Sequence, residues 1–190
     1  MTEVFDKDDP RKLETVISFL EMRRPPARPA RPVPLRKLAI MRAEKPPVGF
    51  YLYLYRSVGA AWNWTDRLMM PAKELEAIIH DDDVEVMVLH VAGVPAGYAE
   101  LDFRNAGDGQ SELGLFGLSP DFIGQRLGGY FLDWAIGALW RPGIERVVVN
   151  TNTLDHPRAL ALYQKAGFEI VGRETSWLVP EDSVERPAES

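Results

Sequence analysis

The chain has 190 residues, of which 46% are hydrophobic and 10% aromatic, enough for one domain with a substantial core and a short appendage. Its 28 acidic and 22 basic residues give a formal net charge of −6, which argues against general nucleic-acid binding because that needs a basic surface. The absence of cysteine excludes disulfides and thiolate nucleophiles, and the three histidines have no spacing typical of a metal site, so no metal is expected.

Residues 1–34 are expected to form an appendage in two parts. An acidic cap and a proline at residues 8–10, followed by apolar residues at helical spacing, predict an amphipathic helix over residues 10–22. Residues 22–34 contain five prolines and four arginines, which predicts an extended arm. This arm is either a stiff connector laid along the surface or a basic segment that contacts a cofactor phosphate or a partner.

The globular part of the sequence begins at Leu35. A first strand is expected within residues 35–43, and helices are expected at Val48–Val58 and Pro71–His80. Between the two helices, Trp62 and Trp64 are too large for an ordinary loop. They are either core residues or the wall of an acceptor pocket.

Three strands are predicted in the middle of the chain. Val84–Val91, Ala96–Arg104 and Ser111–Leu118 are rich in apolar residues and are separated by glycine-containing turns, which is typical of an antiparallel meander. In the second of these strands, Glu100 and Asp102 point to the same face because side chains alternate along a strand.

The pattern changes to alternating helices and strands after residue 124. Helices are expected at residues 125–140 and 156–166, and strands at 145–151 and 168–173, which indicates a parallel crossover from the first of these strands to the second. We therefore expect one α/β domain over residues 35–180 and a flexible tail at residues 181–190. No apolar run reaches the length of a membrane span, and the first residues do not resemble a signal peptide, so a cytoplasmic location is expected.

One candidate site is the segment Leu118–Gly129, which lies between a strand and a helix. Gly124, Gly128 and Gly129 remove side chains where the helix begins and leave its first N–H groups accessible. These donors and the helix dipole can bind a diphosphate. A second candidate is Asp155–Phe168, a short helix that ends at a glycine and carries Tyr163.

Together the two segments resemble the GNAT acetyltransferase superfamily. Leu118, Pro120, Gly124, Leu127 and Gly128 follow its cofactor motif in order, and Ala159, Tyr163, Gly167 and Phe168 follow its later motif. The resemblance covers roughly residues 35–180. It implies a mixed antiparallel and parallel central sheet with a splayed strand pair and flanking helices, and it implies acetyl-coenzyme A as the cofactor.

The resemblance also implies where the cofactor binds. The strand before the motif separates from its parallel neighbour, the pantetheine arm enters the gap, and a backbone N–H polarises the thioester carbonyl. Arg126 stands where the family often has a glycine, and it is either an added phosphate ligand or a solvent-exposed residue. The expected cofactor-binding residues are Phe116, Gly117, Leu118, Ile123, Gly124, Gln125, Arg126, Leu127, Gly128, Gly129, His156 and Tyr163.

Tyr163 corresponds to the family's tyrosine near the departing sulfur, and we expect it to act as an acid or an orienting donor. A protonated amine with a pKa of about 10.4 cannot attack, so a base or a water relay is needed. Glu112, on an otherwise apolar strand, is the predicted base because burial would raise its pKa. Glu100 and Asp102 are the competing carboxylates.

The expected reaction is acetyl transfer to a primary amine by direct attack in a ternary complex. Alternatives are a non-catalytic module that binds acetyl-coenzyme A, transfer of another acyl group, and a partner-binding protein that uses its arginine and proline arm. Trp62, Trp64, Glu100 and Asp102 are the expected contacts of the acceptor, a small-molecule or peptide amine. Exposed sheet edges are compatible with a homodimer.

Overall fold

The computed structural model describes residues 12–178, which form one seven-stranded sheet and five α-helices. The strands are β1 (Leu13–Met22), β2 (Leu38–Arg42), β3 (Val84–Val91), β4 (Val94–Asp102), β5 (Gln110–Leu118), β6 (Arg146–Asn152) and β7 (Glu169–Leu178). The helices are α1 (Val48–Gly59), α2 (Asp66–Met69), α3 (Ala72–Ile79), α4 (Leu127–Leu139) and α5 (Ala159–Ala166).

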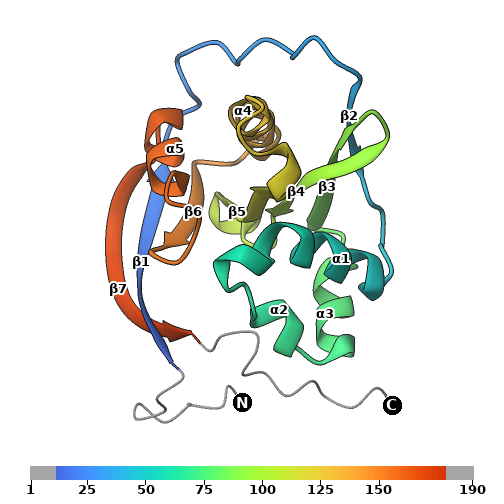
Figure 1. The fold of residues 1–190 in the computed structure, drawn as a ribbon. Helices are drawn as coiled ribbons and strands as arrows, with labels where there is room; N and C mark the ends of the chain where they lie inside the picture. The colour runs from blue at the N-terminus through green and yellow to red at the C-terminus, as the bar shows by residue number, and fades with distance from the viewer. Residues whose placement is uncertain (1–11, 179–190) are drawn as a thin grey trace.

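The sheet is the middle of three layers. Its strand order is β2-β3-β4-β5-β6-β1-β7, and every neighbouring pair is antiparallel except β5 and β6. Helices α4 and α5 lie on one face, and α1, α2 and α3 lie on the other (Figure 1). The expected fold, a mixed α/β sheet with flanking helices, is confirmed.

The helix predicted for residues 10–22 is wrong, because the described part of this segment is strand β1 between β6 and β7. Its apolar residues fit a helical period, but Ser18, Leu20 and Met22 alternate toward the buried face as a strand requires. Antiparallel partners on both sides satisfy the backbone of β1. This tertiary pairing outweighs the local helical spacing.

The predicted parallel crossover also needs a correction. Strands β6 and β7 run in the same direction, but β1 lies between them and is antiparallel to both. The hydrogen-bonded parallel pair is instead β5 and β6, which are connected through α4. The sequence pattern predicts the order of the elements along the chain, but it does not show that β1 is inserted between β6 and β7 in the sheet.

The other predicted elements agree with the structure. The three strands of the meander are β3, β4 and β5, and the helices expected near residues 48–58 and 71–80 are α1 and α3. At one end of the meander, β4 and β5 approach closely at Gly97. A Cβ added to this glycine would lie 2.3 Å from the carbonyl oxygen of Gly117. Any side chain at Gly97 would therefore force β4 and β5 apart.

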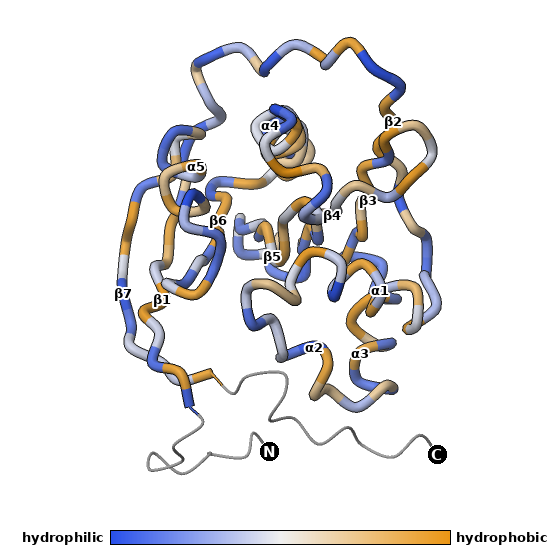
Figure 2. Tube along the Cα trace, in the orientation of Figure 1, coloured by the Kyte–Doolittle hydropathy of each residue, from blue (hydrophilic) through white to orange (hydrophobic). Residues whose placement is uncertain are grey.

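Two hydrophobic cores hold the layers together. One lies under α4, which is largely apolar (Figure 2), and includes Leu127, Phe131 and Leu132, none of which has measurable exposure. The other lies under α1 and α3, where Tyr51 and Tyr98 pack edge to face. The two cores fix the helices on opposite faces of the sheet.

Residues 23–37, called the strap below, connect β1 to β2 and pass over α4 (Figure 1). Within the strap, Arg28 and Arg31 bind the carboxylate of Asp133 on α4. The strap is therefore fastened to the surface, as the connector interpretation expects. The flexible tail predicted at residues 181–190 lies outside the described residues. None of the helices within residues 12–178 has the length and apolar character needed to cross a membrane.

Candidate active site

The parallel strands β5 and β6 separate part-way along their length. Their pairing runs from Gln110 and Arg146 to Leu113 and Val149 and then stops, although β5 continues to Leu118. The separation starts at a β-bulge, because Gly114 has no partner on β4 while its neighbours on either side are paired. Beyond Gly114, no strand within residues 12–178 pairs with the edge of β5 that faces β6, so this edge can pair with a ligand or another chain.

A cavity of about 450 Å³ occupies this opening. Residues 113–118 of β5 line one wall, and Asn150 and Asn152 of β6 lie opposite. Further walls come from α1 and the α1–α2 connection, from the loop before α4, from α5 and from the end of β7. Its volume lies in the lower part of the range for small-molecule sites.

The N-terminus of α4 opens into one end of the cavity. Leu127, Gly128 and Gly129 are its first three residues, and no side chain caps them. The preceding residue, Arg126, has a left-handed backbone with φ of 62°, and Gly124 has φ of 80°. Uncapped N–H groups and the helix dipole make this end attractive to an anion. Among the described lining residues, the cationic side chains of Arg126 and Arg158 add positive charge.

Ten of the twelve residues expected to bind the cofactor line the cavity. They are Phe116, Gly117, Leu118, Ile123, Gly124, Arg126, Gly128, Gly129, His156 and Tyr163. Gln125 is turned away, because its amide donates to the carbonyl of Asp121 and accepts a hydrogen bond from Arg36. Leu127 is fully buried in the core under α4, so only its backbone can serve a ligand.

Tyr163 lies on α5 at the cavity wall and is 5% exposed. Burial raises the pKa of its phenol, and the negative charge of Asp155 raises it further, so the hydroxyl is protonated at neutral pH. Among residues 12–178, no group forms a hydrogen bond with this hydroxyl. It is therefore available as a donor to a ligand.

The α1–α2 connection forms the wall opposite α5. Trp62, Asn63 and Trp64 all line the cavity, as does Asp66 at the start of α2. The indole N–H of Trp64 donates to Asp155 Oδ1 at 2.9 Å. The ring of Trp62 lies 4.9 Å from the ring of His156. These two contacts join the α1–α2 connection to the β6–α5 loop across the cavity.

Sequence reasoning assigned no role to Asp155. The signal was its position directly before the second motif, where a short acidic side chain can accept hydrogen bonds from nearby backbone and hydroxyl groups. In the structure its Oδ2 accepts hydrogen bonds from the Thr151 hydroxyl at 2.7 Å and from the backbone N–H of Asn152 at 2.9 Å. The loop thus presents a carboxylate to the cavity in a fixed orientation.

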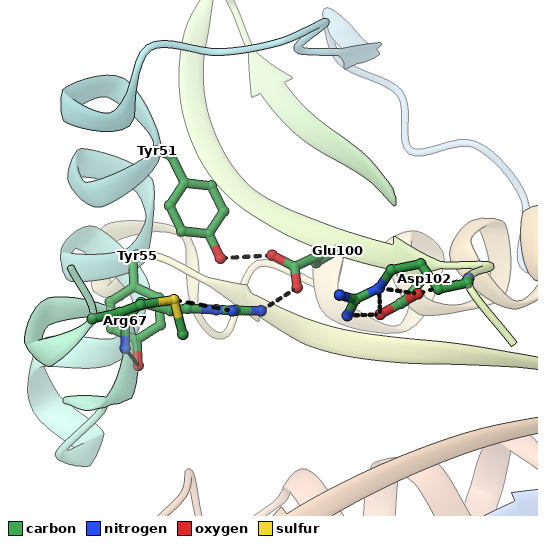
Figure 3. Close-up of polar contacts among 7 residues, drawn as sticks. Tyr51, Tyr55, Arg67, Glu100 and Asp102 are labelled. Carbon is green, nitrogen blue, oxygen red and sulfur yellow. Dashed lines mark hydrogen bonds and ion pairs between the residues drawn. The ribbon is translucent and has the colours of Figure 1, made fainter. Parts of the chain in front are cut away.

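The three carboxylates predicted from the sequence do not line the cavity. Glu100 is 1% exposed and accepts hydrogen bonds from the Tyr51 hydroxyl at 2.6 Å and from the Arg67 guanidinium at 2.7 Å (Figure 3). Asp102 forms an ion pair with Arg104. Both charges are already matched, so neither carboxylate is presented to an acceptor amine.

Glu112 lies beside Asp102 in the sheet register. Burial raises the pKa of its carboxyl, and the negative charge of Asp102 raises it further. Among the described residues, Glu112 has no hydrogen-bond partner. It therefore keeps the electrostatic character expected of a base, although it lies outside the cavity wall.

The sequence model of the Acetyltransferase (GNAT) family matches residues 38–168, more than half of the chain. The chain belongs to the GNAT acetyltransferase family. This span holds both motifs, the bulged strand β5 and the whole of α4. Members of the family typically use acyl-coenzyme A and acetylate amine substrates. Strand β1 and the whole of the strap lie outside the match. A search of curated protein sequences finds no match to this chain.

Solved structures agree on the fold. A GCN5-related N-acetyltransferase from Sphaerobacter thermophilus superposes with a TM-score of 0.60 at 15% identity and covers 87% of this chain, which spans 50% of that protein. An aminoglycoside acetyltransferase from an uncultured soil metagenomic sample gives a TM-score of 0.55 at 15% identity, covering 68% of this chain and 87% of its own. An acetyltransferase from Thermus thermophilus gives 0.54 at 16% identity, covering 75% and 95%. At these identities the likeness establishes the fold alone.

Proposed function

We propose that this protein transfers an acetyl group from acetyl-coenzyme A to a primary amine. The observation that carries the proposal is that the unpaired edge of β5 and the uncapped start of α4 open into the same cavity. A thioester cofactor with a diphosphate needs both features at once. Membership of the GNAT acetyltransferase family supports the same activity.

In this proposal the diphosphate binds the N–H groups of Gly128 and Gly129, with Arg126 as an added cation. The pantetheine arm extends along the free edge of β5. A backbone N–H within Phe116–Leu118 then donates to the thioester oxygen, where negative charge develops as the amine attacks. The glycines at the start of α4 allow the diphosphate to approach the backbone closely.

The amine nitrogen attacks the thioester carbon, the carbon–sulfur bond breaks, and coenzyme A leaves as a thiolate. Because its pKa is raised, Tyr163 is a poor proton source for a thiolate whose conjugate acid has a pKa of about 8.5. We therefore assign Tyr163 as a hydrogen-bond donor to the departing sulfur. Glu112 is the proposed base, and it accepts the amine proton through water because it lies outside the cavity wall.

The test is an assay of thiol release from acetyl-coenzyme A across a panel of primary amines, with the acetylated product identified by mass. Tyr163→Phe should lower kcat about 100-fold, the usual effect of losing one donor to a developing charge, while coenzyme A affinity stays unchanged. Thiol release that is the same in the variant would remove the assignment of Tyr163. Cofactor binding without thiol release for any amine would favour a non-catalytic binding module.

A further inference from the structure

Among the described residues, three donors bond to the carboxylate of Asp155, a residue that lines the cavity. A carboxylate offers about four lone-pair sites. The two sites of Oδ2 are filled by Thr151 and Asn152, and Trp64 fills one site of Oδ1. The remaining lone pair on Oδ1 belongs to a residue that lines the cavity. One strong donor, such as an ammonium group, can complete this set.

The position of Asp155 places this open site near the reaction centre. Asp155 lies on the loop that leads into α5, the helix that carries Tyr163. Asp155 and Tyr163 line the same cavity, and the negative charge of Asp155 raises the pKa of the Tyr163 phenol. A nitrogen held at Asp155 is therefore close to the sulfur that Tyr163 is proposed to contact.

The surroundings of Asp155 define the rest of the ligand. Tyr55, Trp62 and Trp64 give this half of the cavity an aromatic lining. Among the described lining residues, Asp66 and Asp155 are the only acids; Arg126 directly precedes α4, and Arg158 directly precedes α5. The contacts of the two tryptophans with Asp155 and His156 also restrict the space on this side. The cavity of about 450 Å³ must hold the thioester arm as well, so little room remains for the acceptor.

We propose that Asp155 binds the ammonium group of a small primary monoamine whose aryl or alkyl body lies against Trp62 and Trp64. This inference rests on the proposed acetyl transfer and names its acceptor class. The aromatic rings bind the apolar body and attract the cation. A polyhydroxylated aminoglycoside or a peptide does not match an aromatic wall with a single open carboxylate site.

Trp64 is a positioning residue in this account. Its indole N–H holds Asp155 Oδ1 in one orientation, so the open lone pair has a fixed direction. Trp64→Phe keeps an aromatic ring at this position, although a smaller one, and removes the indole donor. We expect the variant to bind the amine more weakly and to distinguish the amine less well from a neutral analogue.

The first experiment is calorimetric titration of the coenzyme A-loaded protein, which does not depend on turnover. The probes are 2-phenylethylamine and hexylamine, their neutral analogues 2-phenylethanol and hexan-1-ol, kanamycin, and a tetrapeptide. We expect both monoamines to bind more tightly than the alcohols and than the two larger probes. Asp155→Asn should weaken binding of the monoamines roughly 10- to 100-fold, as expected for loss of a charged hydrogen bond, and should abolish the preference over alcohols.

The matched control is Asp108→Asn, the same change of charge at an exposed position that does not line the cavity. Coenzyme A affinity and the melting temperature of each variant report on folding. The inference is overturned if neither monoamine binds, if Asp155→Asn binds them as the wild type does, or if kanamycin or the peptide binds more tightly. Monoamine binding that depends on Asp155, without thiol release, would instead contradict the proposed transfer and leave the binding site standing.

Discussion

Glu112 differs from the two acids beside it because no arginine within residues 12–178 is hydrogen-bonded to it, whereas Glu100 is paired with Arg67 and Asp102 with Arg104. The buried Glu100 pair joins α2 to β4 (Figure 3) and thereby anchors the helix that follows the α1–α2 connection. Removing either partner of that pair would leave an uncompensated buried charge, so its role is structural. Glu112 retains a carboxylate that can take up a proton.

Glu112→Gln should remove one limb of the pH–rate profile. In the wild type, kcat should rise as pH passes upward through the raised pKa of Glu112, because only the ionised form accepts a proton. The variant should be slower by about 100-fold and lack this limb. A raised pKa also means that the folded state binds the proton of Glu112 more tightly than the unfolded state does. The stability that this proton contributes is lost as pH rises through the folded-state pKa, so ionised Glu112 opposes folding. The variant should therefore fold at neutral pH at least as well as the wild type.

The control for this prediction is Glu169→Gln, at an exposed position on β7. Rates of both variants should be measured from acidic to alkaline pH with one amine at saturation. An unchanged profile in Glu112→Gln would show that a different group accepts the proton.

The strap is fastened at one residue of α4. The side chain of Asp133 is 5% exposed and accepts hydrogen bonds from the guanidinium groups of Arg28 and Arg31 and from the backbone N–H of Arg31. Arg31 also donates to the carbonyl of Gly129 at 3.0 Å. The strap is therefore tied to the helix whose first amides are proposed to bind the diphosphate.

Asp133→Asn should destabilise the protein by about 1 to 2 kcal/mol at neutral pH. This is less than for a fully buried pair, because the two guanidinium groups are 35% and 37% exposed. Burial alone would raise the pKa of Asp133, but hydrogen bonds from Arg28 and Arg31 lower it overall. The arginine contacts of Asp133 therefore stabilise the folded protein at pH values above its unfolded-state pKa of about 3.9. This stabilisation is lost as pH falls through the lower folded-state pKa.

Urea unfolding at neutral pH and near pH 3 should measure this difference, with Asp108→Asn as the surface control. We expect the free energy of unfolding of the wild type to exceed that of Asp133→Asn at neutral pH, and we expect this difference to be smaller near pH 3. An equal free energy of unfolding at neutral pH would mean that the arginine contacts add no stability to the strap.

At the scale of the whole molecule, the segments with unambiguous local patterns were predicted well. The meander from Val84 to Leu118 alternates apolar and polar residues between glycine turns, and α5 ends at Gly167, whose φ is 111°. The order of the strands could not be predicted, because β1 enters the sheet through pairing with residues more than 120 positions away. Its helical spacing gave no sign of those partners.

The two ends of the candidate site also differ in how well the sequence predicts them. The backbone features of the cofactor end were predictable because glycines at fixed spacing specify them. The acceptor end depends on tertiary contacts such as Trp64 with Asp155, which are 91 positions apart in the sequence. For the same reason, Glu100 was expected to contact the acceptor, since nothing local shows that Arg67, 33 positions away, would pair with it. The partner of Asp102 is local, because Arg104 lies two positions along the chain, but the expectation did not take this pairing into account.

The most direct test of the account is calorimetric titration of coenzyme A into the wild type, Gly128→Asp and Gly137→Asp. Both glycines lie on α4, but Gly128 lines the cavity, whereas Gly137 is exposed and would have open space around an added Cβ. An aspartate in the first turn favours the helix dipole, so weaker binding in Gly128→Asp would not reflect a melted helix. We predict binding to the wild type and to Gly137→Asp, and at least about tenfold weaker binding to Gly128→Asp, where a carboxylate repels the diphosphate. No binding to the wild type, or equal binding to all three proteins, would contradict the account.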